Sequence, residues 1–442
     1  MAGSVHDSQL YNRLFPAGEA ARLFTDSAEV RAMLLVEGAL AKAQGALGLI
    51  PGESADFIHR ASLEIPLDPG GLATSAAQNG VPVPGLVAAF RKAMEAPEHA
   101  QYLHWGATSQ DIMDSAQMLR LRQLLALCET GLQEVLQTLA TQAEAHADLP
   151  MAGRTYGQFA TPVSFGSHVA AWGWPLLDLL EDLPALRRNA LWVSLSGAAG
   201  TSAEFTGKGP ELRAALANGL GLGDPERSWH ADRGPVLRIA AWLTRLAQVL
   251  GKMGEDLVLM AQSSAGEVRL GAAGGSSTMP QKQNPVQPSV LIALARQVIG
   301  LEATLKGAGM PRQERDGAAW FTEWMTLPQL CLSACAALET ARDLVPGLQP
   351  QAQTMAAVFA DSLGLLHAEA LSFRLTETLP RPEAQAAVKS LAQECVATGT
   401  PLADLAARAF PDTDLDGLFD PSRQMGEAPA TARAFAAKVA RL

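Results

Sequence analysis

Long stretches of this 442-residue chain place apolar residues at the spacing of an α-helix. Between residues 28 and 48 the apolar positions recur on one helical face, and Asp26 or Ser27 is suited to cap the first turn. The run from 112 to 148 contains no proline and a single glycine, and its leucines and valines form one broad apolar face. A helix of this length is typical of a helical bundle.

The same periodicity predicts further helices, a short one at 86–97 and longer ones at 165–186, 235–263, 289–309 and 318–345. After residue 350 the predicted helices become shorter and prolines return. No alternation of strands and helices is visible, and a chain of this length exceeds one ordinary core. We therefore predict an all-α protein with an N-terminal helical domain (1–110), a central long-helix bundle (111–348) and a small C-terminal helical domain (349–442).

Polar segments interrupt these helical patterns at 101–111, 150–164 and 271–288, and we expect each to be a loop. Thr108 and Ser109 come directly before the longest predicted helix. Hydroxyls at the start of a helix, together with its free N–H groups, form an anion site. The same side chains also cap helices, and the two interpretations are compatible.

The segment 271–288 is the most unusual stretch of the chain by composition. Three glycines within five residues are followed by serines, a threonine and three prolines. Among them lie groups able to transfer a proton, a fixed cation and an amide: Ser276 or Ser277, Lys282 and Asn284. A plain linker is the alternative, but most connections in compact domains have about 4–6 residues. The composition favours a site for a substrate that carries carboxylates.

Composition and charge narrow the function classes. The formal net charge of −11 argues against broad electrostatic binding to nucleic acid or to an anionic membrane. The four cysteines form no CxxC pair or zinc pattern, and no metal or cofactor motif is visible. The N-terminus has no signal-peptide pattern, and no uninterrupted apolar run is long enough to span a bilayer. We expect a cytoplasmic protein that uses acid–base chemistry without a cofactor.

The sequence of residues 275–285, Gly-Ser-Ser-Thr-Met-Pro-Gln-Lys-Gln-Asn-Pro, resembles the signature loop of the fumarase/aspartase superfamily. Residues 104–111 and 153–158 resemble the first and second family segments, and the likeness spans about residues 20–330. The resemblance implies a three-domain fold whose long-helix bundle forms the core of a homotetramer. It also implies active sites that draw on three subunits.

The resemblance carries roles onto individual residues. Ser276 corresponds to the residue that transfers the proton, and Lys282 and Asn284 would stabilise charge on the reacting carboxylate. The expected substrate contacts are Thr108, Ser109, Thr155, Gln158, Ser277 and Met279, with Arg154 and Arg315 as cationic partners. Further residues expected to line the site are His104, His230 and Tyr156. The arginines serve equally well as members of structural ion pairs, and the histidines as packed core residues.

Two departures from the family pattern narrow the expected reaction. Tyr156 stands where family lyases that expel nitrogen carry histidine, and residues 77–84 lack a second family histidine. With Trp229-His230, these features resemble the 3-carboxy-cis,cis-muconate cycloisomerases, which close a small tricarboxylate to a lactone in the breakdown of aromatic acids through protocatechuate. Three alternatives stay open: an adenylosuccinate-type lyase that releases fumarate, a cycloisomerase for a substituted muconate, and a non-catalytic structural homologue. Gln385, where such cycloisomerases often show histidine, keeps the second open.

Overall fold

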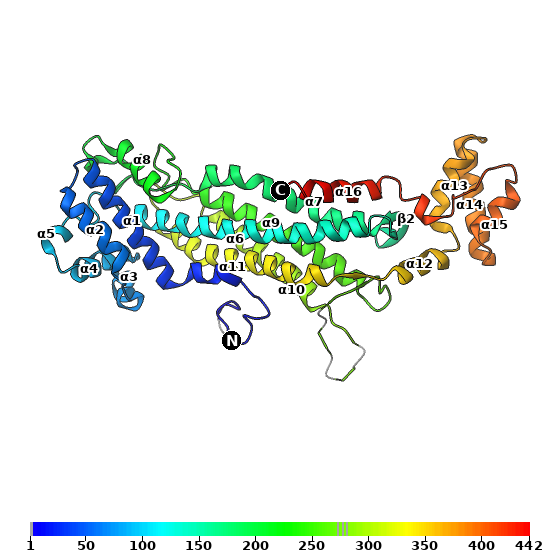
Figure 1. Ribbon diagram of the computed structural model, residues 1–442, viewed down its shortest axis with the longest axis horizontal. Coiled ribbons are helices and arrows are strands. Elements are labelled where there is room, and N and C mark those ends of the chain that lie inside the picture. Colours follow the sequence, from blue (N-terminus) through cyan, green and yellow to red (C-terminus); the bar gives the residue numbers. More distant parts are fainter. Residues whose placement is uncertain (1–2, 272–273, 276–277, 280–281) are drawn as a thin grey trace. The chain divides into compact units, whose positions relative to one another are not determined.

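The protein is represented by a computed structural model that describes residues 3–271, 274–275, 278–279 and 282–442. The described chain is largely helical, which confirms the all-α prediction (Figure 1). The helices are α1 (Asp26–Ala46), α2 (Gly52–Glu64), α3 (Ala73–Asn79), α4 (Val83–Ala93), α5 (Pro97–Ala100), α6 (Ser109–Ala145), α7 (Phe165–Ala190), α8 (Gly209–Leu220), α9 (Gly234–Met260), α10 (Val286–Gly307), α11 (Gly317–Leu344), α12 (Ala352–Asp361), α13 (Ala368–Leu375), α14 (Arg381–Thr398), α15 (Leu402–Ala409) and α16 (Ala428–Val439). The short strands are β1 (Pro150–Thr155), β2 (Gln158–Ser164), β3 (Val268–Arg269) and β4 (Gln349–Pro350).

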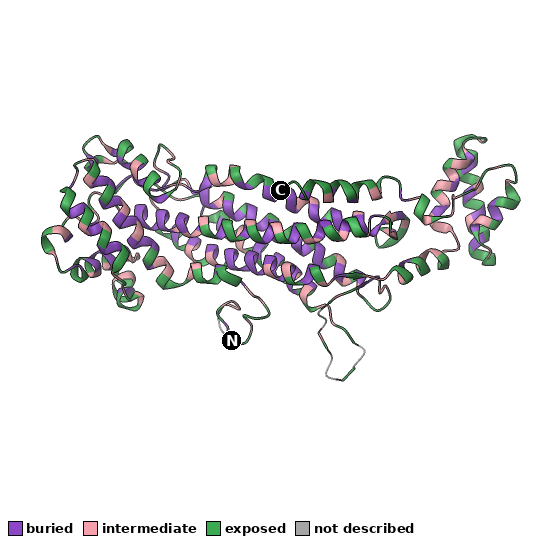
Figure 2. Cartoon of the chain, viewed as in Figure 1, coloured by how far each residue is buried: buried purple, intermediate pink, exposed green. Residues whose placement is uncertain are grey.

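The long helices predicted from apolar periodicity are present. Helix α6 has 37 residues, and α7, α9, α10 and α11 have 26, 27, 22 and 28 residues. Each has a buried side and an exposed side (Figure 2). The expected long-helix bundle is therefore confirmed, and the short helices α12–α16 follow it as the return of prolines predicted.

The described chain forms two compact units, and several long helices contribute to both. Unit 1 comprises residues 1–131, 179–248 and 293–340, and unit 2 comprises residues 132–178, 249–292 and 341–442. The predicted domain limits at residues 110 and 348 stay a prediction, because this division into units follows packing across the chain and does not test them.

In unit 1, α1, α2 and α4 pack on α8 and on the start of α6 around a common apolar core. Gly106 shows how tightly this core meets the loop before α6. A Cβ atom at Gly106 would lie 2.6 Å from the Phe205 ring, and its φ of +70° is one that glycine adopts without strain. Helix α11 joins α6 through Cys128 and Cys335, whose sulfur atoms lie 3.8 Å apart. Burial raises the pKa of the neighbouring Cys331 thiol, as expected for a core residue.

The prediction of a loop at 150–164 is wrong, because β1 and β2 of unit 2 form an antiparallel hairpin. Thr155 pairs with Gln158, which leaves Tyr156 and Gly157 as a two-residue turn. Their φ angles are +52° and +74°, and turns with two positive φ angles match the right-handed twist of the strands. Tyrosine is not a usual residue for the first turn position, so the sequence pattern concealed the hairpin.

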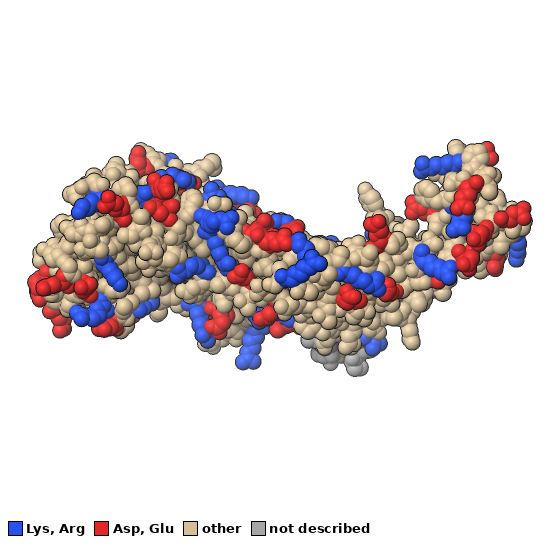
Figure 3. Space-filling model, turned by 45° about the horizontal axis from the view of Figure 1, so that its top comes forward, with Lys and Arg blue, Asp and Glu red and all other residues tan. Residues whose placement is uncertain are grey.

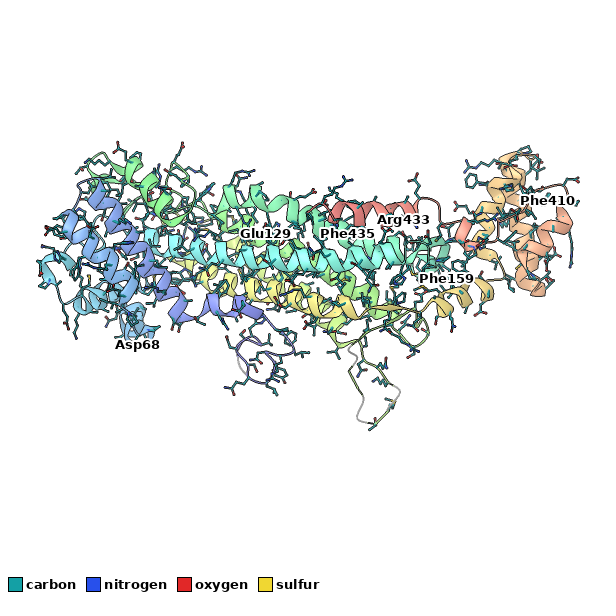
Figure 4. All side chains as sticks on the ribbon, viewed as in Figure 1. Asp68, Glu129, Phe159, Phe410, Arg433 and Phe435 are labelled. Carbon is teal, nitrogen blue, oxygen red and sulfur yellow. The ribbon has the colours of Figure 1, made fainter. Side chains whose placement is uncertain are left out.

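In unit 2, α13, α14 and α15 surround a small core of their own. Helix α16 packs on α7 through Phe435, which points toward α7 (Figure 4). Its ring lies edge-on to Trp174 with the centroids 5.5 Å apart. Gly173 makes this contact feasible, because a Cβ atom there would lie 2.0 Å from the Phe435 ring.

One described helix, α10, is long and apolar enough to cross a membrane, although only 39% of its most apolar window is buried inside the structure. The bent pair formed by α12 and residues 365–375 passes the same test. Helices of soluble proteins also have these properties, so the observation is weak evidence for a membrane span. Basic and acidic side chains are intermingled on the face shown in Figure 3.

Candidate functional site

The start of α6 is capped by Asp111. Thr108 precedes the helix and donates its backbone N–H to Asp111 Oδ2 over 3.1 Å, an arrangement that satisfies one of the free N–H groups of the first turn. Within the described residues, the side-chain hydroxyls of Thr108 and Ser109 make no hydrogen bond, and both residues are half-buried. Asp111 therefore does the capping, and the two hydroxyls are available for another partner.

Asp111 also joins three segments of unit 1. Its side chain is fully buried, and its oxygens accept the backbone N–H groups of Ser196 and Gly197 at 2.8 and 2.9 Å. Oδ1 also accepts the Nε2–H of His230 at 2.8 Å. A buried carboxylate with this many donors is well compensated for its loss of water. Asp111 ends the polar segment 101–111 of the sequence, but no sequence pattern revealed that its carboxylate organises this site.

Gln110, His230 and Arg315 meet beside this carboxylate. Arg315 donates from Nε to Gln110 Oε1 at 2.8 Å and from Nη2 to the carbonyl oxygen of Ala198 at 3.1 Å. Gln110 donates to the carbonyl oxygen of His230 at 3.0 Å. His230 directs Nε2–H to Asp111, and its Nδ1 is buried without a hydrogen-bond partner among the described residues. These residues line a hollow of only about 10 Å³.

A buried charge network supports this corner. Arg233 donates two hydrogen bonds to Asp114, at 2.8 and 3.0 Å, and two to Glu323, at 2.9 and 2.8 Å. Although burial alone lowers the pKa of Arg233, the two carboxylates outweigh burial and raise it above its usual range. The network joins α6 and α11 to Arg233, which directly precedes α9 and lies three residues after His230. Sequence reasoning missed it, because its members are far apart in the chain.

His104 lies on the approach to α6 and pairs with a buried glutamate. Its Nδ1 is 2.6 Å from Glu37 Oε1, and the Glu37 side chain is fully buried. Burial favours the neutral ring, but the charge and hydrogen bond of Glu37 outweigh this and raise the pKa of His104. His104 also has a φ of +62°, which is unusual for a residue with a side chain. The pair anchors the segment that leads to Thr108.

In unit 2, Arg154 of the hairpin is engaged by an acidic residue. Its guanidinium forms two hydrogen bonds to the buried carboxylate of Glu267, at 2.9 and 2.8 Å. It also lies 4.9 Å from the centroid of Phe159, which is labelled on β2 in Figure 4. Beyond this pair, Thr155, Tyr156 and Gln158 are exposed at the tip of the hairpin. Arg154 is therefore a member of a structural ion pair, as one of the two interpretations expected. Its role in substrate binding stays a prediction.

The signature loop belongs to unit 2 and is closed at its base by two backbone hydrogen bonds. Gly274 and Asn284 exchange N–H···O bonds of 3.1 and 2.8 Å. Lys282 is exposed and Asn284 half-buried, while Met279 is 43% exposed. Ser276 and Ser277 lie outside the described residues. Lys282 and Asn284, the predicted cation and amide, therefore lie just before the first residue of α10, Val286.

The predicted site residues thus fall into two groups. Unit 1 contains His104, Thr108, Ser109, His230 and Arg315, and unit 2 contains the hairpin residues together with Met279, Lys282 and Asn284. Within the described ranges, no group of three or more histidine, cysteine, aspartate or glutamate side chains is placed to hold a metal ion. The arrangement offers hydroxyls, amides and cations, which bind carboxylates, and a histidine–aspartate pair, which can relay a proton.

Comparison with known proteins agrees with this geometry. A family model described as lyase matches residues 16–300. This chain belongs to that lyase family. The match confirms the resemblance to the fumarase/aspartase superfamily, which was based on the 275–285 motif, and the chain has the fold of that superfamily.

Relatives of the chain include enzymes named for different activities. A 3-carboxy-cis,cis-muconate cycloisomerase of Pseudomonas aeruginosa is 39% identical, with 96% of this chain and 95% of the relative covered. The structure of a 3-carboxy-cis,cis-muconate lactonizing enzyme from Pseudomonas putida aligns with a TM-score of 0.91 and 35% identity, over 98% of this chain and 99% of that chain. A nitrosuccinate lyase of Streptomyces davaonensis is 34% identical, over 96% of this chain and 94% of the relative.

Proposed function

We propose that this family member is a 3-carboxy-cis,cis-muconate cycloisomerase, which closes its substrate to 4-carboxymuconolactone. One observation carries the proposal: the lactonizing enzyme of Pseudomonas putida matches 98% of the chain with a TM-score of 0.91. Tyr156, where family lyases that expel nitrogen carry histidine, supports the same reaction, because ring closure releases no leaving group that needs a proton.

The reaction is an intramolecular addition that keeps every atom of the substrate. One carboxylate oxygen attacks a carbon of the conjugated diene, and a carbon–oxygen bond forms as the carbon–carbon π bond breaks. The displaced electron pair moves toward a second carboxylate, which becomes an enolate-like dianion. A proton then reaches the neighbouring carbon. Fixed donors at the developing charge are worth roughly 3–4 kcal/mol each.

Lys282 and Asn284 are the proposed donors to that developing charge. Lys282 is an exposed cation, and Asn284 is fixed through its backbone bonds to Gly274. We assign the proton transfer to Ser276 on the resemblance of its motif alone. The unengaged hydroxyls of Thr108 and Ser109, next to the start of α6, suit a substrate carboxylate, since helix N-termini attract negative charge.

Arg315 and His230 complete the proposed set. Arg315 bonds to Gln110 through Nε and to Ala198 through Nη2, and the same guanidinium lines the hollow with its positive charge. His230 lines the hollow and is oriented by Asp111, and its buried Nδ1 has no hydrogen-bond partner among the described residues, so this nitrogen can accept a hydrogen bond. We propose that Arg315 binds a carboxylate and that His230 assists the proton transfer.

A homotetramer with shared sites is the proposed assembly. The hollow beside Arg315 has only about 10 Å³, which is far too small for a tricarboxylate. Helix α10 supports the assembly as well, because two of its large apolar side chains stay exposed in the single chain, Val286 at 36% and Ile299 at 42%. Light scattering coupled to size-exclusion chromatography tests this proposal, and a monomeric mass at active concentrations contradicts it.

We also propose a cytoplasmic location. Cys128, Cys331, Cys335 and Cys395 are free thiols in the structure, and reducing compartments maintain thiols. Cell fractionation with an antibody against the protein tests the assignment.

A lyase that acts on a substituted succinate is the second candidate. The nitrosuccinate lyase that is 34% identical to this chain favours it, because the two chains match along nearly their whole lengths. The decisive assay follows ultraviolet absorbance of purified protein with 3-carboxy-cis,cis-muconate, and in parallel with nitrosuccinate and adenylosuccinate. Loss of the diene absorbance with the muconate alone supports the cycloisomerase. Fumarate release from a succinyl compound, without turnover of the muconate, supports the lyase instead.

The same assay tests the proton donor. Ser276→Ala is expected to lower kcat by about 10²–10⁴-fold, the contribution typical of acid–base catalysis, with an unchanged circular-dichroism spectrum. Ser289→Ala is a matched control, because Ser289 is exposed and, among the described residues, its hydroxyl bonds to the carbonyl oxygen of Pro285 within its own helix turn. Full activity of Ser276→Ala would show that another residue transfers the proton.

A further inference from the structure

Unit 1 contains a second cavity that no part of the proposed reaction uses. Its volume is about 180 Å³, and it lies between the starts of α1, α6 and α11. Phe24, Trp320 and Trp324 form an aromatic wall. The two indole rings are tilted by 59° with their centroids 4.8 Å apart. A cavity of about 150 Å³ is large enough to hold a benzene molecule, so this one accommodates a single ring with a small substituent.

The cavity has one weakly paired cation, Arg120. Its Nη1 contacts the carbonyl oxygen of Leu23 and the carboxylate of Glu29, each only at the long distance of 3.5 Å. The Arg120 side chain is only 11% exposed, and its buried Nε has no hydrogen-bond partner among the described residues. A buried donor without a partner is costly, and the Nε edge of a guanidinium is one that carboxylates bind with two hydrogen bonds.

The other charged groups around the cavity leave this arginine available. Asp114 lines the cavity, but both its oxygens are engaged by Arg233. Glu29 is 38% exposed and contacts only Nη1, on the other side of the guanidinium from Nε. Gln117 is held by a hydrogen bond of 3.0 Å to Glu323. The cavity therefore combines aromatic walls with one incompletely paired positive charge.

We propose that this cavity is a binding site for a planar aromatic monocarboxylate with a single ring. The carboxylate accepts hydrogen bonds from the guanidinium of Arg120, whose side chain lines the cavity, and the ring lies against Trp320 and Trp324. The site is distinct from the proposed catalytic residues and does not depend on the reaction assigned to them.

Trp320 links this site to the catalytic corner. Its side chain lines both the aromatic cavity and the small hollow beside Gln110, His230 and Arg315. A ring bound against Trp320 therefore contacts one wall of the hollow beside Gln110, His230 and Arg315, which we call the catalytic corner, without occupying that hollow. This shared wall makes an aromatic acid in the second cavity suited to act as an effector rather than as a substrate.

Calorimetric titration of the full-length protein with benzoate tests the proposal, with benzamide as a neutral ligand of the same shape. Benzoate is expected to bind and to quench tryptophan fluorescence, whereas benzamide binds more weakly. Arg120→Met is expected to weaken benzoate binding roughly 10- to 100-fold, because a charge-assisted hydrogen bond is lost. Trp324→Leu removes part of the wall without touching the charge and is expected to weaken both ligands.

Arg315→Met is the matched control, because it removes an arginine from the other cavity. Binding that is lost in Arg120→Met and kept in Arg315→Met supports the proposal. The reverse pattern would place benzoate in the catalytic corner and overturn it, as would equal binding of benzamide or the absence of any benzoate binding. Circular dichroism of each variant verifies the fold. Should Arg120→Met not fold, the comparison of benzoate with benzamide and the Trp324→Leu variant still decides the question.

Discussion

His230 and Asp111 form a buried pair in which the imidazole Nε2–H donates to the carboxylate Oδ1 over 2.8 Å. The two residues are 119 positions apart in the chain, on the segment before α9 and on the first turn of α6. Asp111 simultaneously caps α6 and holds the N–H groups of Ser196 and Gly197. The orientation of the candidate proton-transfer histidine is thus coupled to the start of the longest helix.

Replacing Asp111 by asparagine is expected to destabilise the protein by roughly 3 kcal/mol, because an NH₂ group then faces buried donors. Asp232→Asn is the matched control, since Asp232 is 44% exposed in its pair with Arg227. That control is expected to change the stability by less than about 1 kcal/mol. Urea denaturation of both variants measures the difference, and equal stabilities would show that Asp111 is not the organising group.

His230→Gln is expected to lower kcat for muconate turnover by about 100-fold or more while the fold is retained. A role limited to packing predicts a loss of stability with little change in kcat. His146→Gln is the comparison, because His146 lies near the end of α6 and has no proposed role in the reaction. Steady-state kinetics and urea denaturation of the two variants decide between these outcomes.

The His104–Glu37 pair is expected to make the stability depend on pH. The folded pKa of His104 is raised above its unfolded value. The resulting stabilisation is fully present below the unfolded pKa of about 6.5 and is lost as pH rises through the folded pKa. The difference in melting temperature between the parent and His104→Gln should therefore shrink as the pH rises above about 6.5. Strain at a φ of +62° adds a cost that is the same at every pH.

Glu37→Gln separates these two effects. It removes the partner charge but leaves His104 and its backbone conformation in place. The pH dependence attributed to the pair is expected to disappear in this variant. Its persistence would show that other groups cause it.

Two glycine substitutions are expected to have opposite effects. Gly157 has a φ of +74° in the hairpin turn with no atom near an added Cβ, so Gly157→Ala is expected to destabilise by about 1 kcal/mol through backbone strain alone. Gly219 lies within α8 and is equally open, so Gly219→Ala is expected to stabilise by about 0.5–1 kcal/mol. Chemical denaturation measures both changes, and an unchanged or raised stability of Gly157→Ala would argue against the two-residue turn.

The helical content of this protein is predictable because it depends on local periodicity. The long apolar face of α6 and the prolines that follow residue 350 are visible in the chain itself. The hairpin at 150–164 was missed because Tyr156 adopts a positive φ that its residue type does not favour. Hairpin pairing joins residues on either side of that turn, so the local pattern of polar residues was read as a loop.

The candidate site is likewise predictable only where its residues are neighbours in the sequence. Its motif residues, among them Thr108, Lys282 and Asn284, stand in contiguous segments, and contiguous patterns can be recognised in one sequence. The partners of Arg315, Arg154 and His104 lie 205, 113 and 67 residues away, so no spacing rule points to them. Only packing of the helices brings such residues within hydrogen-bonding distance.

The sequence by itself determined the helical class, the superfamily and the segments that carry the chemistry. The tertiary structure decided which polar groups are satisfied and which are left open. Within the part of the chain that the structure describes, Arg154 is engaged by Glu267, Asp111 accepts several donors, and Nε of Arg120 is left without a hydrogen-bond partner. The physical reason is that a side chain's chemistry follows from its type, whereas its pairing and burial depend on distant segments that meet only in the folded chain.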